Sequence, residues 1–287
     1  MEIEKTFYEI AARTAANVQK DDDDYIEDGL LHCGKCHGKK QTRVDVFGTE
    51  KIFYCLCKCA VEKREQEEQE RKNRERLFEV MRMRKTGFTD AEMKDWTFDK
   101  DDGKNAEITQ IARNYVDNFA EMKKRGKGLL LFGSVGTGKT FISACIANAL
   151  IDKGRPCLVT NFTRLVNTIS GMREGKQDYI DSLNDFDLLV IDDLESERDT
   201  EYMGEIVQNV IDSRSRAGLP LIITTNLTSE ELKKPADIKK QRLYSRLLGM
   251  CRPVHVEGKD RRKQKLIDEV DEIDALLGLN VAKRNDN

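Results

Sequence analysis

Eight consecutive residues near the middle of the chain have the types and spacing of a phosphate-binding loop. They match the pattern G-x-x-x-x-G-K-[ST], in which glycines let backbone N–H groups close around phosphate oxygens. The lysine of this pattern reaches the β- and γ-phosphates, and the final hydroxyl ligates Mg²⁺. We therefore expect ATP and Mg²⁺ to bind here. The residues of the loop are Gly133, Ser134, Val135, Gly136, Thr137, Gly138, Lys139 and Thr140.

Two later apolar runs end in polar side chains. The run LLVI leads into Asp192 and Asp193, and the run LIIT leads into Thr225 and Asn226. Ligands of open parallel sheets bind at the ends of the strands. Asp192 is predicted to hold Mg²⁺, Asp193 to orient and deprotonate the attacking water, and Asn226 to hydrogen-bond the γ-phosphate or that water. Helix capping is the alternative for the two aspartates, and an ordinary turn is the alternative for the asparagine.

Two arginines near the C-terminus, Arg246 and Arg262, complete the candidate catalytic residues. A guanidinium offers a planar, permanently charged fork to the oxygens of a transferring phosphoryl group, either within its own subunit or from a neighbour. Surface arginines are common, so a structural role remains open for both. The adjacent Arg261 also leaves open which of the two neighbouring arginines would face the phosphates.

Clustered cysteines in the N-terminal part of the chain predict a metal site. Cys33 and Cys36 form a Cys-x-x-Cys pair, and Cys55, Cys57 and Cys59 offer three candidates for the two remaining places. Four thiolates around a tetrahedral Zn²⁺ can staple a segment too small to be held by apolar burial alone. A redox pair and unpaired structural thiols are the alternatives. A zinc ribbon that contacts DNA is a further functional alternative, although no aromatic platform interleaves the basic residues.

The surrounding pattern predicts an α/β fold. From Gly87 onward, short apolar runs alternate with helical patterns, which indicates a parallel sheet between helices. Residues 61–86 lack proline, hold no glycine, and carry opposite charges at i,i+4 spacing, so we expect a long charged linker helix. The predicted domains are a small zinc-binding module over 1–60, this linker over 61–86, and an ATPase domain over 87–287. The acidic run Asp21–Asp24 is expected to be a solvated boundary.

Composition excludes some classes of protein. Hydrophobic residues make up 39% of the 287 residues and charged residues 35%, with a net charge of −3. A net charge so close to zero does not by itself indicate a nucleic-acid binder, so any DNA contact must come from local patches. No stretch approaches the roughly 20 apolar residues that span a bilayer. The N-terminus has no signal-peptide pattern, so we predict a cytoplasmic protein without a membrane partner.

Taken together, the segments 133–140, 188–193, 223–226 and 244–249, with Arg262, look like the Walker A, Walker B, sensor 1, arginine-finger and sensor 2 elements of AAA+ ATPases. More narrowly, the block from Trp96 to Arg262 resembles the DnaC/IstB-like family of bacterial and phage helicase loaders. The resemblance implies that Arg246 acts on the ATP of the next protomer and that Arg262 reaches the phosphates of its own subunit. Asp193 stands where the wider superfamily usually carries glutamate, which suits slow, partner-regulated hydrolysis.

The family resemblance also implies a function. It predicts an ATPase that loads the replicative ring helicase, of the DnaB type, onto single-stranded DNA when replication begins. Hydrolysis would be slow and stimulated by assembly or DNA, with self-association through the ATP site and helicase binding through the N-terminal module. The alternatives are an IstB-like transposition helper ATPase and a non-catalytic nucleotide-binding adaptor. The cysteine module argues against the first, and the complete set of Asp192, Asp193 and Asn226 argues against the second.

Overall fold

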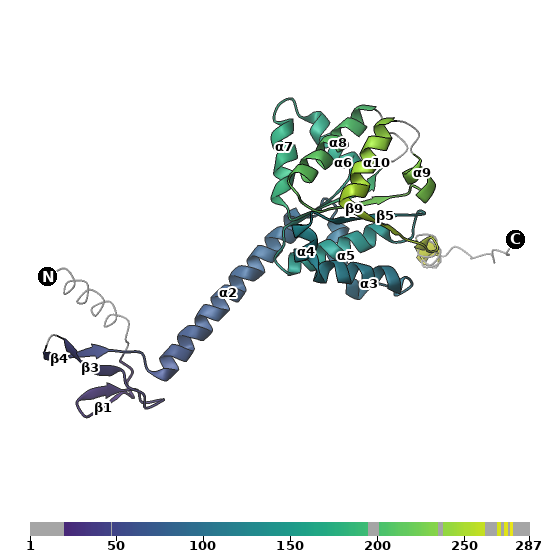
Figure 1. Ribbon diagram of the computed structural model, residues 1–287. Coiled ribbons are helices and arrows are strands. Elements are labelled where there is room, and N and C mark those ends of the chain that lie inside the picture. Colours follow the sequence, from purple (N-terminus) through teal and green to yellow (C-terminus); the bar gives the residue numbers. More distant parts are fainter. Residues whose placement is uncertain are drawn as a thin grey trace. The chain divides into compact units, whose positions relative to one another are not determined.

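The computed structural model describes residues 20–46, 48–194, 201–234 and 238–261, together with six positions between 269 and 277. The chain divides into two compact units between Leu77 and Phe78 (Figure 1). The division falls within one long helix, α2 (Lys58–Thr86). Within the described part of the chain, no helix is long and apolar enough to cross a membrane.

The N-terminal unit contains two small antiparallel sheets. Strands β1 (Tyr25–Glu27) and β2 (Leu30–His32) form one, and β3 (Gln41–Val46) and β4 (Thr49–Tyr54) form the other. The second sheet is a tight hairpin, because the Gly48 N–H donates to Asp45 Oδ1 at 2.7 Å and closes the turn. Strands this short bury little apolar surface, so the unit needs other links to hold it together.

A buried ion pair provides one such link and corrects the expectation for the acidic run. The Asp24 side chain is fully buried, and Lys40 Nζ donates to Asp24 Oδ2 at 2.6 Å and to Asp21 Oδ2 at 3.0 Å. Burial disfavours the Lys40 ammonium, but these two carboxylates outweigh it and raise the pKa of Lys40 above its usual value. The end of the acidic run therefore belongs to the folded module, because Asp24 neutralises a buried lysine.

The helix α2 forms from strong helix formers and is stabilised by pairs of opposite charge on its surface. Examples are Lys63 with Glu67 and Arg71 with Glu75, each at i,i+4 spacing. The helix ends at Gly87, whose N–H donates to the Met83 carbonyl at 2.7 Å. A side chain at position 87 would place its Cβ 2.5 Å from the Cys157 carbonyl oxygen, so the close approach requires glycine.

The C-terminal unit is a five-stranded parallel sheet in the order β6-β7-β8-β5-β9, which confirms the predicted α/β fold. Alternate side chains of the buried strands serve opposite faces of the sheet, so each face has its own core. The strands are β5 (Gly128–Phe132), β6 (Cys157–Asn161), β7 (Leu188–Leu194), β8 (Leu221–Thr225) and β9 (Cys251–His255).

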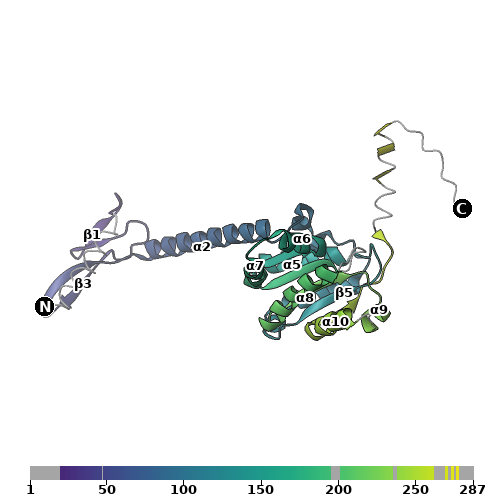
Figure 2. The ribbon, with the colours of Figure 1, turned by 90° about the horizontal axis from the view of Figure 1, so that it is seen from above.

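Helices cover both faces of this sheet (Figure 2). The core on one face includes side chains of α3 (Ala106–Asp117), α4 (Phe119–Lys124) and α5 (Lys139–Asp152). The core on the other includes α6 (Phe162–Gly171), α8 (Glu201–Arg216) and α10 (Ile238–Met250). Shorter elements connect them: η1 (Ala91–Asp95), η2 (Phe98–Lys100), α7 (Lys176–Ser182), η3 (Leu183–Asp185) and α9 (Ser229–Lys233).

One buried arginine fixes where the central strands begin. Arg214 of α8 is fully buried, and its guanidinium donates to the backbone carbonyls of Phe186 at 2.8 Å and Pro220 at 2.6 Å. Burial lowers the pKa of Arg214 to about 10. The Arg214 side chain thereby links the segments that lead into β7 and β8. These two strands carry polar residues at their opposite, C-terminal ends.

Candidate functional site

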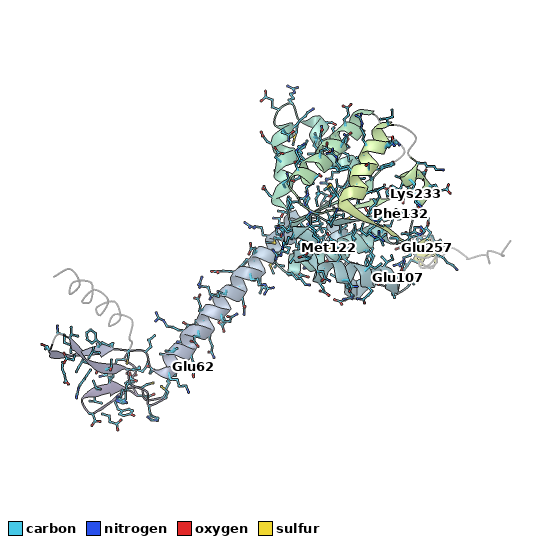
Figure 3. All side chains as sticks on the ribbon, viewed as in Figure 1. Glu62, Glu107, Met122, Phe132, Lys233 and Glu257 are labelled. Atoms are coloured by element: carbon cyan, nitrogen blue, oxygen red, sulfur yellow. The ribbon has the colours of Figure 1, made fainter. Side chains whose placement is uncertain are left out.

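The phosphate-binding loop runs from the end of β5 into α5, in the context that the sequence predicts. Phe132, the last residue of β5, marks the edge of the sheet from which the loop departs (Figure 3). Gly136 has φ +78°, and a Cβ there would lie 1.9 Å from Asp260 Oδ1. Only glycine therefore fits at this position, where the chain that follows β9 lies over the loop. The Arg261 N–H donates to the Gly136 carbonyl at 3.0 Å and holds that chain in place.

Lys139 is buried at the base of the loop. Its Nζ donates to the Gly133 carbonyl at 2.8 Å, to the Ser134 carbonyl at 2.7 Å and to Asn226 Oδ1 at 2.9 Å. The ammonium is thus surrounded by oxygen acceptors and held in place. Phosphate oxygens are acceptors of the same kind with more negative charge, so the site suits a polyphosphate.

Asp192 and Asp193 at the end of β7 are placed by a single hydroxyl. Thr224 Oγ1 donates to Asp192 Oδ1 at 2.5 Å and accepts from the Asp193 N–H at 2.9 Å. Burial raises the pKa of Asp192, while hydrogen bonds from the Thr224 and Thr140 hydroxyls act in the opposite direction. The Asp192 carboxylate therefore lies against the loop threonine, which is the pairing that a shared Mg²⁺ requires.

Asp193 occupies an unusual backbone conformation next to an irregularity in the sheet. Its φ is +56°, and the pairing of β7 with β8 shifts register between Ile191 and Leu194. The shift turns Asp193 out of the strand, so that its Oδ1 accepts from Asn226 Nδ2 at 3.1 Å. Lys139, Asn226 and Asp193 thus form a continuous hydrogen-bonded row, and the sequence-predicted residues are brought together.

The hydroxyl of Thr225 faces away from this row. Thr225 Oγ1 donates to the Leu194 carbonyl at 3.0 Å and so secures the shifted end of β7. Sequence reasoning singles out Thr225 and overlooks Thr224, whose hydroxyl contacts the two aspartates. Both threonines are buried, and only the alternation of side chains along β8 distinguishes them.

We expect Thr224→Val to slow ATP hydrolysis by about tenfold or more, because it leaves the Asp193 N–H and the Asp192 carboxylate without their shared partner. Valine keeps the volume and the β propensity of threonine. Thr225→Val is the matched control, since it removes a buried hydroxyl from the adjacent position without touching either aspartate. Phosphate release should fall in the first variant only. An equal loss of turnover in both would mean that Thr224 acts through strand stability alone.

A cavity of about 550 Å³ adjoins the loop and includes residues that sequence reasoning missed. Trp96 and Phe141 lie on its wall with their ring centroids 5.9 Å apart, and Lys100 and Asp102 lie nearby. Asn148 fixes this wall, because its Nδ2 donates to the Met93 and Trp96 carbonyls at 2.8 and 2.9 Å. Aromatic and polar groups beside a phosphate-binding loop provide the surface that a nucleoside needs.

The three C-terminal arginines fall in different places. Arg261 lines the cavity, and its guanidinium pairs with Asp102 Oδ1 at 2.9 Å. Arg262 lies outside the described residues. Arg246, on α10, pairs with Asp212 of α8, and its side chain is 45% exposed. In the described part of the chain it does not line the cavity of its own subunit.

A second, more open groove of about 710 Å³ lies on the other side of the aspartates. The start of α6 forms part of its wall, with Asn161 capping the helix and Arg164 beside it. Asp192 and Asp193 line both this groove and the nucleotide cavity. Asp193 can therefore be approached from a side that its own phosphate-binding loop does not cover.

The cysteine cluster of the N-terminal unit has the geometry of a metal site. The sulfur atoms of Cys33, Cys36, Cys57 and Cys59 all lie within 4.8 Å of one another. Sulfur ligands of tetrahedral zinc are separated by about 3.8 Å, given a Zn–S distance of about 2.3 Å. The four thiols therefore fit a metal ion, and they leave no ligand position for water.

Cys55 is not part of this cluster, which corrects its place among the candidate ligands. It directly follows β4, and its Sγ donates to the Lys39 carbonyl at 3.4 Å. Cys57 and Cys59, at the start of α2, turn toward the Cys-x-x-Cys pair instead. Backbone N–H groups of Cys59 and Gly38 lower the pKa of Cys36 to about 6, which favours the thiolate that binds metal.

We expect the purified protein to carry about one zinc ion per chain. Removing the metal should unfold the module, because four closely spaced thiolates repel one another without a cation and the small sheets cannot compensate. Metal analysis after purification under reducing conditions measures the content. Cys55→Ser is the control and should keep the zinc, whereas Cys57→Ser should lose it. A metal-free protein with a folded module would contradict the assignment.

Comparison with known proteins gives a consistent result. The replicative helicase loader DnaI of Bacillus subtilis is 27% identical over 165 residues, which is 53% of this chain and 53% of that protein. The replicative helicase loader DnaC of Escherichia coli is 28% identical over 127 residues, covering 43% of this chain and 51% of the relative. Each match thus spans about half the length of the curated relative.

Structural comparison supports the same fold. A crystal structure of DnaI matches with a TM-score of 0.52 and 22% identity, covering 63% of this chain and 99% of that one. At 22% identity, the similarity between the two structures shows the fold alone. The sequence profile described as "IstB-like ATP binding protein" matches residues 58–268, which is most of the chain. The chain therefore belongs to the family of IstB-like ATP binding proteins.

Proposed function

We propose that the C-terminal unit binds ATP with Mg²⁺ and hydrolyses it slowly. The observation that carries this proposal is the hydrogen-bonded row from Lys139 through Asn226 to Asp193, which joins the phosphate-binding loop to the carboxylate that would face water. Membership of an ATP-binding family agrees with it. Arg261 and the wall formed by Trp96 and Phe141 complete the nucleotide cavity.

Each residue has a role that follows from its position. The loop N–H groups and Lys139 hold the phosphates, while Thr140 and Asp192 would hold Mg²⁺, which neutralises charge on the phosphate oxygens. Asp193 accepts a proton from the attacking water, and Asn226 orients Asp193 through its amide. Because Lys139 and Asp193 share Asn226, loss of the γ-phosphate can be transmitted from one to the other.

We further propose that the whole chain is an ATP-dependent loader that places a ring-shaped replicative helicase on single-stranded DNA. The two loaders to which it is similar support this assignment. In this proposal the N-terminal module, residues 1–60, binds the helicase. Subunits associate through the ATP site, where Arg246 of one copy approaches Asp193 of the next through the open groove.

The alternative from the same family, a transposition helper, has no observation in its favour here beyond the family itself. A non-catalytic adaptor is disfavoured by the placement of Asp193. The backbone of Asp193 has the strained φ of +56°, and its side chain is oriented by the hydrogen bond from Asn226. This combination is typical of a catalytic position.

Binding to the cognate replicative helicase tests the loader assignment. We expect the intact chain to capture the helicase in a pull-down and to promote its loading onto circular single-stranded DNA. Cys33→Ser/Cys36→Ser should lose helicase binding and keep ATP binding, because the two functions lie in separate units. Lys139→Ala should still bind the helicase and fail to load it. A chain that binds ATP and ignores the helicase would contradict the proposal.

A further inference from the structure

The part of α2 that enters the C-terminal unit carries an exposed apolar ridge. Phe78 and Met81 are 66% and 64% exposed. On the same helix, Val80 and Met83 pack against the core of the C-terminal unit. Because successive residues are 100° apart around a helix, the ridge lies on the side opposite to these two. Large apolar side chains clustered on the outer face of a helix indicate a surface that another element covers.

Basic side chains flank this ridge. Arg82 and Lys85 lie on the same face, and neither side chain has an ion-pair partner within the described part of the chain. Positions 78, 81 and 85 follow the +3, +4 spacing of a coiled-coil seam. We call this surface, formed by Phe78, Met81, Arg82 and Lys85, the basic ridge. It suits an acidic helix with an apolar seam of the same period.

The chain itself contains a segment of that kind. In the sequence 266–277, the apolar residues Val270, Ile273 and Leu277 follow the same +3, +4 spacing. All the charged residues of this segment are acidic. Val270, Ile273 and Leu277 are helical, and Ile273 and Leu277 are 52% and 66% exposed. The acidic residues are Asp268, Glu269, Asp271, Glu272 and Asp274.

We propose that the acidic segment 266–277 of one copy packs on the basic ridge of a second copy. The two seams have the same period, so Val270, Ile273 and Leu277 can interdigitate with Phe78 and Met81. Glu269 and Asp274 lie beside the apolar seam of the segment, and Arg82 lies beside the apolar seam of the ridge. Opposite charges therefore meet at the edge of the contact. Two basic ridges would repel each other, and two acidic segments would do the same. The charges therefore select pairing of a segment with a ridge.

The sheet places the two surfaces too far apart for contact within one chain. The end of α2 adjoins the start of β6, since Gly87 lies against Cys157, whereas Arg261 lies over the loop at the far end of β5. Strands β6 and β5 are separated by β7 and β8, so they lie roughly 14 Å apart at strand spacing, and the five residues of β5 add roughly 16 Å along the strand direction. The stretch from Arg261 to Leu266 spans at most about 18 Å. It would have to cross the sheet, run back along the strands and then pass outward to the ridge, so a second copy is the occupant.

Charge reversal in full-length chains tests this contact. One variant carries Arg82→Glu/Lys85→Glu on the ridge, and the other carries Glu269→Lys/Asp274→Lys on the segment. The assays are sedimentation and pull-down between differently tagged copies, without ATP or DNA, so the ATPase and loader proposals do not influence the result. Arg64→Glu/Lys72→Glu is the matched control on α2, away from the ridge. Circular dichroism confirms that every variant remains folded.

We expect the unmodified chain and the control to self-associate at high micromolar concentration. Each reversed variant alone should associate about a hundredfold more weakly, since like charges then meet at the rim. The equimolar mixture should regain association, because the unmodified segment of the first variant fits the unmodified ridge of the second, and the reversed ridge of the first fits the reversed segment of the second. Two results would overturn the proposal: an unmodified chain that stays monomeric, or a mixture that remains dissociated.

Discussion

Replacing Asp193 with asparagine should leave ATP binding unchanged and slow hydrolysis by about a thousandfold. The substitution removes the negative charge that accepts a proton from water and keeps the size of the side chain. Asparagine also tolerates the φ of +56° at this position better than almost any other residue. Its carbonyl oxygen can still accept from Asn226 Nδ2, so the hydrogen-bonded row stays intact. Nucleotide affinity and phosphate release, measured on the same preparation, separate binding from turnover.

Lys139→Ala provides the comparison for this experiment, because it should abolish ATP binding itself. Its ammonium is held by two loop carbonyls and Asn226, and nothing in the loop replaces a positive charge at that point. Normal turnover in Asp193→Asn would assign water activation to another acid. Glu195 is the next candidate along the chain, and it lies outside the described residues. Asp193→Ala is less informative, since alanine at a positive φ strains the backbone as well.

The sequence predicts four of the five parallel strands, because β5, β6, β7 and β8 are short continuous apolar runs. It does not predict β9. That strand contains Pro253, which lacks an N–H, and its residues are mostly half-buried or exposed. β9 pairs with β5 alone and lies at the edge of the sheet, where one side of its backbone needs no partner. A proline is tolerated there, and no local apolar pattern identifies the strand.

The candidate site likewise has residues that the sequence predicts and residues that it does not. The phosphate-binding loop and the two aspartates are recognisable because their chemistry lies in consecutive residues whose spacing is fixed by one turn or one strand. Trp96, Asp102 and Arg261 reach the cavity from remote segments, and their contacts depend on how those segments pack. One signal was available: Asn148 interrupts an apolar helix and is 1% exposed. A buried amide needs partners, and it finds them in the backbone that carries Trp96.

ATP hydrolysis should depend on assembly, because Arg246 does not line the cavity of its own subunit in the described part of the chain. Arg246 is half-exposed on α10, where the ion pair with Asp212 holds its guanidinium at the surface. Delivered by a neighbour to the open groove beside Asp193, an arginine can raise the rate by a factor of roughly 10³. Turnover should therefore rise steeply with protein concentration. Single-stranded DNA should increase it further by aligning subunits along one strand.

Mixing two inactive variants decides whether the arginine acts between subunits. Lys139→Ala lacks a working loop and Arg246→Ala lacks the arginine, so neither should hydrolyse ATP alone. With random mixing in head-to-tail contacts, about a quarter of the interfaces pair an intact loop with an intact arginine, and activity should return to that extent. Arg242→Ala, on an exposed position of the same helix, is the control and should keep full activity. If the mixture stays inactive while each variant still assembles on DNA, Arg246 acts within its own chain or only pairs with Asp212, and a shared ATP site is excluded.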